Sequence, residues 1–320
     1  MRARLIVNPR SGTDRAPALL PLIAERLRTR VADLDITLTT GEQDIVRAAS
    51  RAVDEGCDLL FVAGGDGTLN IAVRSVAACP GGFERLAFGI IPTGTGNDFA
   101  KALDLGEVAE AALDRLLEAQ IIDVDLGFVN DRAFVNISAG GFVADVSATL
   151  TEELKDATGK LSFVIGGARA LFGREPFAAD IRLGEGTGES GTASARPYPA
   201  MDLQMFTVCN ARFIGGGYPM APDALIDDGL LDVFLVKQTP TLEFVSLLQK
   251  MAAGEHAADD RILSFRAADF ELIFDRVVHV NTDGEVLEAD RCSYRVRRRA
   301  ARFLCGPRPL AAASRRPLMV

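Results

Sequence analysis

Residues 61–70 read F-V-A-G-G-D-G-T-L-N and predict a strand, a tight loop and the start of a helix. The apolar run 59–63 stops at Gly64, and a helical pattern follows from Leu69. Glycines let the backbone approach a ligand, and the free N–H groups of a first helical turn can bind a phosphate. Asp66 would repel that phosphate unless a cation such as Mg²⁺ lay between them. We therefore expect a phosphate and cation site here; the alternative is an ordinary glycine-rich turn.

The composition indicates a globular protein of two domains. The chain has 320 residues, 48% hydrophobic and 25% charged, which is enough apolar material for more than one core. No apolar run reaches the roughly 18 residues that span a bilayer, and the first strand begins too early to leave room for a signal peptide. Five cysteines without C-x-x-C spacing favour reduced thiols in a cytoplasmic protein, and two histidines are too few for a histidine-based metal site.

The charge of the chain is unevenly distributed. The net charge is −9, yet nine arginines and no acidic residue occur from Arg291 to the end. An acidic protein is a poor non-specific binder of nucleic acid, so we expect no nucleic-acid partner. The basic end of the chain either contacts an anionic membrane surface or is a solvated final strand with a frayed terminus.

The first part of the chain alternates strands and helices with short connections. This pattern predicts a doubly wound, Rossmann-like α/β domain over residues 1–125, with its loops at the carboxyl ends of a mostly parallel sheet. The expected strands are 2–7, 36–40, 58–63, 86–91 and 121–126, and the expected helices are 17–27, 44–53 and 107–119.

The period changes after about residue 125. Asn130-Asp131 between two apolar runs predicts a hairpin, and residues 126–297 are expected to form a mainly antiparallel β-sandwich. Residues 298–320 are expected to rejoin the first domain. The expected strands are 177–183, 201–209, 230–236, 269–274, 277–281 and 293–297; helices are expected near 142–154, 161–172 and 241–251, with a turn at 184–195.

Two other phosphate-binding loops and the motif set of protein kinases are excluded. A Walker loop needs G-x-x-x-x-G-K-[ST], but the only Gly-Lys pair, Gly159-Lys160, is followed by Leu161. The dinucleotide fingerprint G-x-G-x-x-G fails because its last position is Asn70. The H-R-D and D-F-G motifs of protein kinases are absent.

Several motifs occur in one order along nearly the whole chain. They are N-P-R-S-G at 8–12, G-G-D-G-T-L-N at 64–70, P-T-G-T-G-N-D-F-A at 92–100, D-L-G-F-V-N at 125–130, N-I-S-A-G-G-F at 136–142, P-D-A-L-I-D-D-G-L at 222–230 and D-G-E at 283–285. This set resembles the diacylglycerol kinase catalytic-domain family, in particular its bacterial, YegS-like lipid kinases. G-G-D-G alone is also found in NAD kinases and phosphofructokinases, whereas the ordered set is specific.

The resemblance implies a lipid kinase that uses ATP and Mg²⁺, with the nucleotide phosphates held by backbone amides. Thr40 and Thr95 would add hydroxyl contacts, although Thr40 also suits a simple strand-end turn. The nucleotide contacts that the resemblance implies are Asn8, Pro9, Arg10, Ser11, Gly12, Thr40, Gly64, Gly65, Asp66, Gly67, Thr68, Leu69, Asn70, Ile71, Thr95, Asn97 and Asp98.

Two magnesium sites are implied. Asp66 would hold the catalytic ion, with Asp98 and Asp125 in the surrounding carboxylate and water network; the alternative for Asp98 is a helix N-cap. A second, structural ion would take main-chain carbonyls of Leu225 and Leu230 and the carboxylate of Asp228, with water completing the shell.

The acid of the D-G-E motif is the expected general base. A lipid hydroxyl must lose its proton as it attacks the γ-phosphorus, and Glu285 would accept it, presented by a turn that contains the catalytic residue Asp283. The alternative is an ordinary Asp-Gly hairpin turn.

Two positions depart from the family pattern. Ile71 stands where the family usually has Glu, which removes a side-chain contact, and Lys101 stands where Arg is frequent, which keeps the charge and loses the bidentate fork.

The apolar side chains expected to line the lipid site between the domains are Phe172, Phe177, Phe213, Ile214, Tyr218 and Met220.

We therefore expect an ATP-dependent kinase that phosphorylates a hydroxyl of a diacylglycerol-like lipid. It would act in the cytoplasm, in transient contact with the inner face of the membrane, with a homodimer as a further expectation. The alternatives are an NAD kinase-like enzyme and a catalytically silent lipid-binding protein. The motifs do not identify the lipid.

Overall fold

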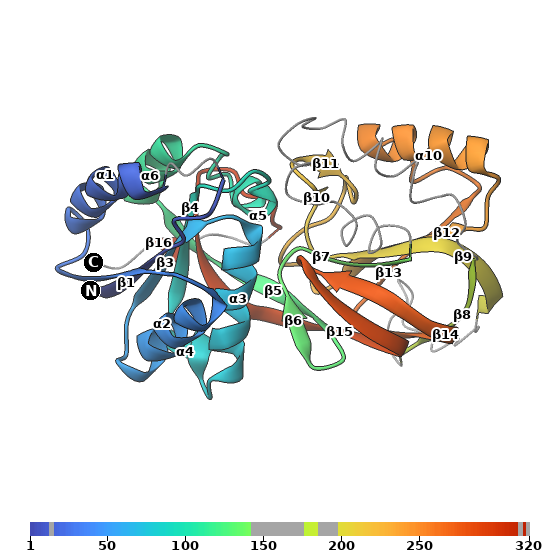
Figure 1. Ribbon diagram of the computed structural model, residues 1–320, viewed down its shortest axis with the longest axis horizontal. Helices are drawn as coiled ribbons and strands as arrows, with labels where there is room; N and C mark the ends of the chain where they lie inside the picture. The colour runs from blue at the N-terminus through green and yellow to red at the C-terminus, as the bar shows by residue number, and fades with distance from the viewer. Residues whose placement is uncertain (13–15, 142–175, 185–197, 313–315, 318–320) are drawn as a thin grey trace.

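The computed structural model describes residues 1–12, 16–141, 176–184, 198–312 and 316–317. Figure 1 shows two halves side by side, one of alternating strands and helices and one dominated by long strands. The helices expected near 142–154 and 161–172, nearly all of the turn at 184–195, and Phe172 lie outside the described residues.

The first half contains a parallel sheet in the order β2-β1-β3-β4. All six residues of β3 and of β4 are buried, as expected of strands that are covered by helices on both faces. In Figure 1, α1 and α6 lie on one side of this sheet and α2, α3 and α4 on the other. The strands are β1 (Arg2–Val7), β2 (Asp33–Leu38), β3 (Leu59–Gly64) and β4 (Ala87–Pro92); the helices are α1 (Ala16–Arg28), α2 (Glu42–Asp54), α3 (Asp66–Ala78), α4 (Gly82–Arg85), α5 (Asp98–Ala102) and α6 (Ala109–Leu117).

The second half is mainly antiparallel. The hairpin predicted at Asn130-Asp131 is confirmed, because Val129 pairs with Arg132 and Asn130 has a left-handed φ of 52°. The elements are β5 (Gln120–Val129), β6 (Arg132–Phe134), β7 (Ile137–Gly141), β8 (Phe177–Leu183), β9 (Tyr198–Cys209), β10 (Phe213–Ile214), β11 (Tyr218–Pro219), β12 (Leu231–Lys237), α10 (Thr241–Ala253), β13 (Ile262–Ala267), β14 (Asp269–Thr282), β15 (Glu285–Cys305) and β16 (Arg316–Pro317).

One strand, β15, joins the two halves. It pairs with β14 and β5 in the β-rich half and then runs parallel to β4, where Phe303 is opposite Phe88. The rings of these two residues stack with their centroids 5.2 Å apart in the core of the first half. Two further apolar clusters lie in the β-rich half. The two halves are therefore connected by a continuous hydrogen-bonded sheet.

The structure corrects four expectations from the sequence. Helix α3 begins at Asp66, three residues before the expected start, because Gly65 is its extended N-cap. Strand β13 was not predicted. Strands 269–274 and 277–281 form the single strand β14, with an irregularity between Ile273 and Val278. Strand β15 is much longer than the predicted 293–297, because its exposed arginines interrupt the apolar pattern.

The described helices are too short or too polar for the bilayer. None of them has the length and apolar character needed to cross a membrane.

Candidate active site

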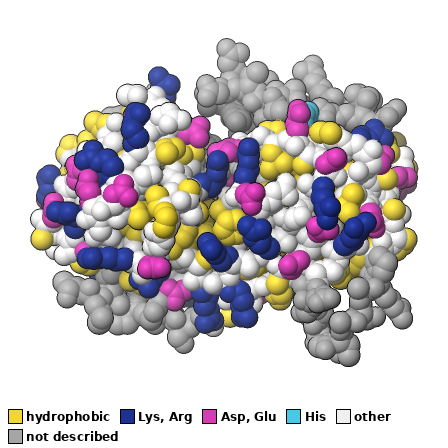
Figure 2. Space-filling model, turned by 90° about the horizontal axis from the view of Figure 1, so that it is seen from below, with side chains coloured by type: hydrophobic (Ala, Val, Ile, Leu, Met, Phe, Trp, Pro, Cys, Tyr) yellow, Lys and Arg dark blue, Asp and Glu magenta, His cyan; other side chains and the backbone are white. Residues whose placement is uncertain are grey.

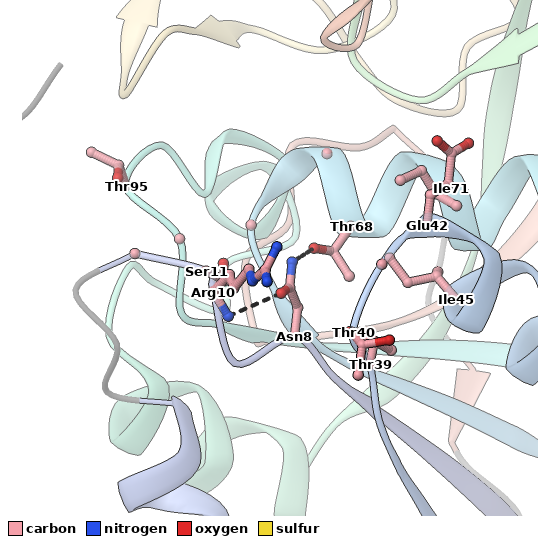
Figure 3. Close-up of a pocket in the computed structure, with 15 residues that line it drawn as sticks. Asn8, Arg10, Ser11, Thr39, Thr40, Glu42, Ile45, Thr68, Ile71 and Thr95 are labelled. Atoms are coloured by element: carbon pink, nitrogen blue, oxygen red, sulfur yellow. Dashed lines mark hydrogen bonds between the residues drawn. The ribbon is translucent and has the colours of Figure 1, made fainter. Parts of the chain in front are cut away.

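Three loops meet at the carboxyl ends of β1, β3 and β4. The amide nitrogen Nδ2 of Asn8 donates to Oγ1 of Thr68 at 2.8 Å, and the backbone N–H of Asn8 donates to the carbonyl of Ala63 at 2.9 Å. The backbone N–H of Thr93 donates to the carbonyl of Gly64 at 3.1 Å. Parallel strands thus bring the three glycine-rich motifs to one edge of the sheet, as the sequence predicts (Figure 3).

Two glycines allow these loops to touch through their backbones. A Cβ atom on Gly94 would lie 2.5 Å from Cα of Gly65, closer than real Cβ atoms come to backbone. Gly12 has a φ of +71°, and a Cβ there would collide with the carbonyl oxygen of Thr93. Glycine at these two positions therefore lets the backbones of the loops pack directly against each other.

A pocket of about 410 Å³ opens between these loops and the start of α2. Ten predicted nucleotide residues line it: Asn8, Arg10, Ser11, Gly12, Thr40, Gly65, Gly67, Thr68, Ile71 and Thr95 (Figure 3). Five residues that were not predicted complete the wall: Thr39, Gly41, Glu42, Ile45 and Gly94. The predicted residues Pro9, Gly64, Asp66, Leu69, Asn70, Asn97 and Asp98 are not in the wall; of these, Leu69 and Asn70 are buried in α3.

Thr40 lies on the pocket wall, but its hydroxyl has a partner in the protein. Its Oγ1 donates to Oδ2 of Asp44 at 2.6 Å, and its backbone N–H donates to the same oxygen at 2.8 Å. These bonds are the main reason why the pKa of Asp44 falls to about 2. The threonine therefore fixes the start of α2, and a nucleotide contact by this hydroxyl would need its lone pairs.

Asp66 stands at the first turn of α3, and its carboxylate reaches a second helix. Its two oxygens accept the backbone N–H groups of Asp98, at 3.1 Å, and Phe99, at 3.2 Å, which begin α5. Burial and, next, the charge of Asp98 raise the pKa of Asp66. A partly buried carboxylate beside a like charge is stabilised by a nearby cation, so this position suits a metal ligand.

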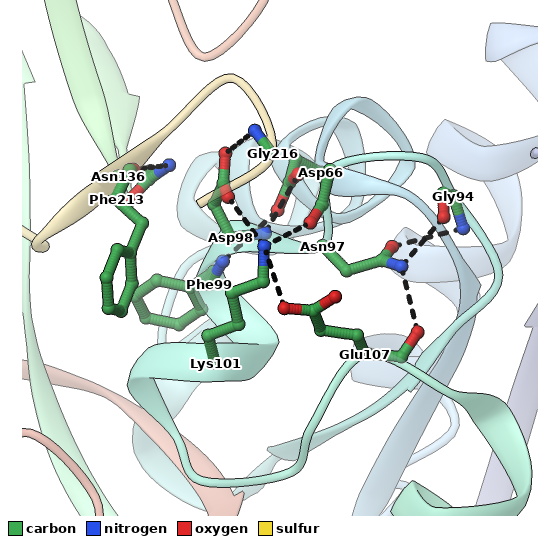
Figure 4. Close-up of polar contacts among 11 residues, drawn as sticks. Asp66, Gly94, Asn97, Asp98, Phe99, Lys101, Glu107, Asn136, Phe213 and Gly216 are labelled. Atoms are coloured by element: carbon green, nitrogen blue, oxygen red, sulfur yellow. Dashed lines mark hydrogen bonds and ion pairs between the residues drawn. The ribbon is translucent and has the colours of Figure 1, made fainter. Parts of the chain in front are cut away.

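Asp98 connects the two halves of the molecule (Figure 4). The residue is 3% exposed; its Oδ2 accepts the backbone N–H of Gly216 at 3.0 Å, and its Oδ1 lies 3.2 Å from Nζ of Lys101. Lys101 also donates to the carbonyl of Gly96 at 2.9 Å and lies 3.4 Å from Glu107. The lysine thus supplies a positive charge beside the Asp66 and Asp98 carboxylates.

Asn97 holds the loop itself in place. It has a left-handed φ of 53°, and its side chain accepts from the backbone N–H of Gly94 at 3.0 Å and donates to the carbonyl of Gly94 at 2.7 Å. The second donor bond goes to the carbonyl of Glu107 at 3.3 Å. These bonds fix the loop conformation that brings Asp98 to Asp66.

Asp125 contacts the 225–230 turn and not Asp66. Its Oδ2 accepts the backbone N–H of Gly229 at 2.5 Å and its Oδ1 that of Arg299 at 2.6 Å, while burial raises its pKa. Asp125 therefore anchors the 225–230 turn, and the prediction that it belongs to the carboxylate network around Asp66 is not supported by these contacts.

Asp228, in the same turn, is engaged by protein groups. Its Oδ1 accepts the backbone N–H of Leu230 at 3.0 Å, and its Oδ2 pairs with Arg266. The same guanidinium lies 3.2 Å from Asp232. A cation at Asp228, with carbonyls of Leu225 and Leu230, would have to share that carboxylate with Arg266.

The predicted catalytic turn lies at the junction of β14 and β15. Asp283 and Gly284 have φ values of 48° and 96°, and Thr282 pairs with Glu285 across them, as in a two-residue hairpin. The carboxylate of Asp283 accepts three backbone N–H groups, those of Val135 at 2.8 Å, Asn136 at 3.3 Å and Ile137 at 2.8 Å. Asp283 thus anchors the turn to the loop after β6.

Glu285 itself reaches back to the first half. Its carboxylate pairs with Arg74 of α3 and lies 3.6 Å from Arg132 of β6. The helix that starts at the glycine-rich loop therefore also carries a side chain that contacts the predicted base.

Comparisons with known proteins agree with this arrangement. Residues 2–129 match the family model described as the diacylglycerol kinase catalytic domain, and residues 136–305 match the YegS C-terminal NAD kinase beta sandwich-like domain. The chain belongs to the diacylglycerol kinase family.

Relatives of this lipid kinase occur in several bacteria. It is 28% identical to a YegS-like lipid kinase of Shewanella frigidimarina, over 95% of this chain and 94% of the relative. It is 30% identical to a diacylglycerol kinase of Staphylococcus saprophyticus, over 89% and 88% of the two chains. A Bacillus anthracis structure described as a diacylglycerol kinase superposes with a TM-score of 0.79 at 26% identity, covering 96% of this chain and 95% of the other.

The side chains of this lipid kinase fit a magnesium ion that takes one or two ligands from the protein and the rest from phosphate and water. Among the described residues, no group of three or more His, Cys, Asp or Glu side chains is placed to hold a metal. The half-buried carboxylate of Asp66 and the buried carboxylate of Asp98 nevertheless offer hard oxygen ligands. Mg²⁺ is commonly held by one or two carboxylates together with substrate phosphates and water, so this pair fits such an ion.

The carboxylate of Asp283, which anchors the hairpin turn, makes the stability of the protein depend on pH. Burial raises the pKa of Asp283 to about 6 despite its three N–H bonds, so between about pH 4 and 6 the folded protein keeps a proton that the unfolded chain has lost. This group therefore lowers the free energy of unfolding as pH rises through that window. Relative to Asp283→Asn, the wild type should lose about 2 kcal/mol between pH 4.5 and 7, measured by urea unfolding.

The difference in unfolding free energy between the wild type and Asp283→Asn isolates the effect of the Asp283 carboxylate. Asp125, whose pKa is also raised, contributes to both proteins alike. The charge of Asp66 helps to raise the pKa of Asp283, so its effect on that carboxylate is part of the measured difference. The lost acceptor of the Asn variant lowers its stability by the same amount at each pH. Parallel pH dependences of the two proteins would contradict the prediction.

Proposed function

We propose that this lipid kinase transfers the γ-phosphoryl group of ATP to a hydroxyl of a diacylglycerol-like lipid at the junction of its two halves. The observation that best supports this proposal is that α3 begins at Asp66, in the proposed phosphate-binding loop, and contacts Glu285 through Arg74. One helix thus connects the proposed phosphate site with the proposed base.

The nucleotide is proposed to occupy the pocket between the three loops. Backbone N–H groups after Gly65, at the N-terminus of α3, would bind its phosphates, and Arg10 in the pocket wall adds a positive charge. Ile71 lines the same wall, so the position where the family usually has Glu offers the nucleotide an apolar contact. Asp66 and Asp98 would hold Mg²⁺, which neutralises charge on the phosphate oxygens when bound.

The chemical step then needs one base. The lipid hydroxyl oxygen bonds to the γ-phosphorus, the bond from that phosphorus to the bridging oxygen of ADP breaks, and the hydroxyl proton passes to the carboxylate of Glu285. Asp283 holds the turn in place through its three backbone bonds and is proposed as a positioning residue rather than a proton acceptor.

The lipid is proposed to enter beside the β10–β11 hairpin. Phe213, Ile214 and Tyr218 are partly exposed there, and the carbonyl of Phe213 accepts a bond from Asn136 at 2.9 Å, next to the anchored turn. Phe177 and Met220, which were also predicted to line the lipid site, are 4% and 6% exposed and belong to apolar clusters. Those two are core residues.

Finer features of the fold remain proposals. The sheet order β2-β1-β3-β4 with helices on both sides supports a doubly wound, Rossmann-like domain over residues 1–125. The packing of Phe303 and Cys305 in the first core supports its completion by residues 298–320, and the antiparallel strands of 126–297 support a β-sandwich.

Contact with an anionic membrane is proposed through arginines of the β-rich half. Lys and Arg side chains gather near the middle of the face in Figure 2. The exposed Arg295 and Arg297 of β15 lie over the ring of Phe128, at 5.1 and 5.8 Å. The chain end is packed rather than frayed as far as Leu310, which donates to the carbonyl of Ala102 at 2.8 Å. A cytoplasmic location at the inner membrane face and a homodimer stay predictions.

A direct assay separates this proposal from its rivals. The candidate lipids are diacylglycerol, phosphatidylglycerol and sphingoid bases, each presented in mixed micelles. With radiolabelled ATP and Mg²⁺, the protein should phosphorylate at least one of these hydroxylated lipids and should not phosphorylate NAD. Product identification by mass spectrometry would name the lipid. Label on NAD alone would favour the NAD kinase-like alternative, and lipid binding without ADP release would favour a silent binding protein.

A further inference from the structure

Glu285 lies between two arginines that come from different parts of the fold. Its Oε1 pairs with the guanidinium of Arg74 on α3, and its Oε2 lies 3.6 Å from Nη1 of Arg132 on β6. The side chains of Arg74, Arg132 and Glu285 are 29%, 44% and 30% exposed, so the cluster borders solvent.

The backbone around Glu285 is fixed by other contacts. The backbone N–H of Gly284 donates to Oδ1 of Asn281 at 2.8 Å, and Asp283 is anchored by three N–H groups. These bonds set the position of the Glu285 Cα but leave its side-chain torsions free to rotate. Arg74 and Arg132 are the ion-pair partners that the described structure gives its carboxylate.

Arg74 also shares a helix face with the proposed phosphate and metal site. Asp66, Asn70 and Arg74 are spaced by four residues on α3, so they lie in a row on one side of the helix. Asn70 is 1% exposed, and its Oδ1 accepts no hydrogen bond within the described part of the chain. A buried oxygen without a partner calls for a ligand or water, and this one lies between Asp66 and Arg74.

We propose that Arg74 and Arg132 are positioning residues that hold the Glu285 carboxylate in the orientation that receives the proton of the lipid hydroxyl. This inference rests on the proposed role of Glu285 as the base. Each arginine takes one carboxylate oxygen, and each oxygen has two lone pairs, so both keep one for the incoming hydroxyl. Guanidinium groups stay charged at every working pH, so the arrangement persists through turnover.

The test measures kcat and KM separately in arginine variants. Arg74→Ala and Arg132→Ala should each lower kcat about 10- to 100-fold, because the base loses its orientation, and should leave the KM for ATP within about twofold. Arg74→Lys should recover part of the loss, because the ammonium keeps the charge and loses the planar fork. Arg85→Ala is the matched control, since Arg85 makes a comparable ion pair with Asp58 at 2.6 Å, and its kcat should equal that of the wild type.

Repeating the Arg74 substitution in a Glu285→Asp variant shows whether Arg74 acts through Glu285 or directly on a substrate. In Glu285→Asp the carboxylate is withdrawn by one methylene, so adding Arg74→Ala should lower kcat by a much smaller factor than it does in the wild type. The same factor in both backgrounds would overturn the proposal, because Arg74 would then act on the phosphates or the lipid directly. Wild-type kcat in both alanine variants would overturn it as well.

Two controls keep these outcomes distinct. Thermal unfolding of every variant is measured, and Arg74→Gln, which keeps most of the side-chain packing, replaces Arg74→Ala if the alanine variant does not fold. Near wild-type turnover of Glu285→Gln would contradict the proposed base itself. An inactive Glu285→Gln with unaffected arginine variants would contradict only the positioning role.

Discussion

Glu285→Gln is expected to lower kcat by about 10²- to 10⁴-fold, the range that a positioned general base contributes. The amide cannot accept the hydroxyl proton. Glu285 does not line the proposed nucleotide pocket. Binding of ATP, measured by isothermal titration, should therefore be unchanged. The two functions are separable because the pocket and the turn belong to different halves of the molecule.

Glu288→Gln is the matched control for this variant. Glu288 is on the same strand, β15, is 69% exposed and lies 3.2 Å from His279. The two variants carry the same change of charge on one strand, so a comparable loss of kcat in both would point to an effect on β15 rather than on proton transfer. Near wild-type turnover of Glu285→Gln would remove the residue from the role of base.

Asp66→Asn is expected to lower kcat/KM by about 10²- to 10³-fold, with a much weaker dependence on Mg²⁺. The variant keeps an oxygen that can accept the N–H of Asp98 or Phe99 but loses the negative charge that a cation needs. Because burial and the charge of Asp98 raise the pKa of this carboxyl, the folded protein should not lose stability. Activity across a Mg²⁺ titration and urea unfolding measure the two effects.

Asp54→Asn, an exposed acid at the end of α2, controls for the change in net charge. If Asp66→Asn kept the Mg²⁺ dependence of the wild type, the ion would be held elsewhere. If it unfolded the protein, the carboxylate would serve mainly to hold the start of α5.

Local sequence signals predict the first half of the fold well. The junction of β3 and α3 is visible because a fully buried apolar run meets three glycines and a helical pattern. Strand β15 is harder to see, because exposed arginines at 295, 297, 298 and 299 hide its alternation, and its pairing with both β5 and β4 is a long-range property. Strand β13 was missed because only Ile262 and Ala267, at its two ends, are buried.

Local sequence signals likewise predict only part of the candidate site. Glycine spacing indicates the phosphate-binding loops, since close backbone approach at Gly12 and Gly94 requires that residue type. The pocket wall formed by Glu42 and Ile45 carries no comparable local signal, because those residues take part only through the packing of α2 beside β1. The pairing of Arg74 with Glu285 joins positions more than 200 residues apart and becomes visible only in three dimensions.

The glycine-rich loops and the Glu285 turn are proposed to serve one reaction. A crystal structure with Mg²⁺ and a non-hydrolysable ATP analogue tests it directly. The predicted result places the triphosphate on the backbone N–H groups after Gly65, with the ion at Asp66 and the Glu285 carboxylate about 6 Å from the γ-phosphorus, which leaves room for one hydroxyl. A triphosphate bound elsewhere, or a γ-phosphorus more than about 10 Å from Glu285, would contradict it.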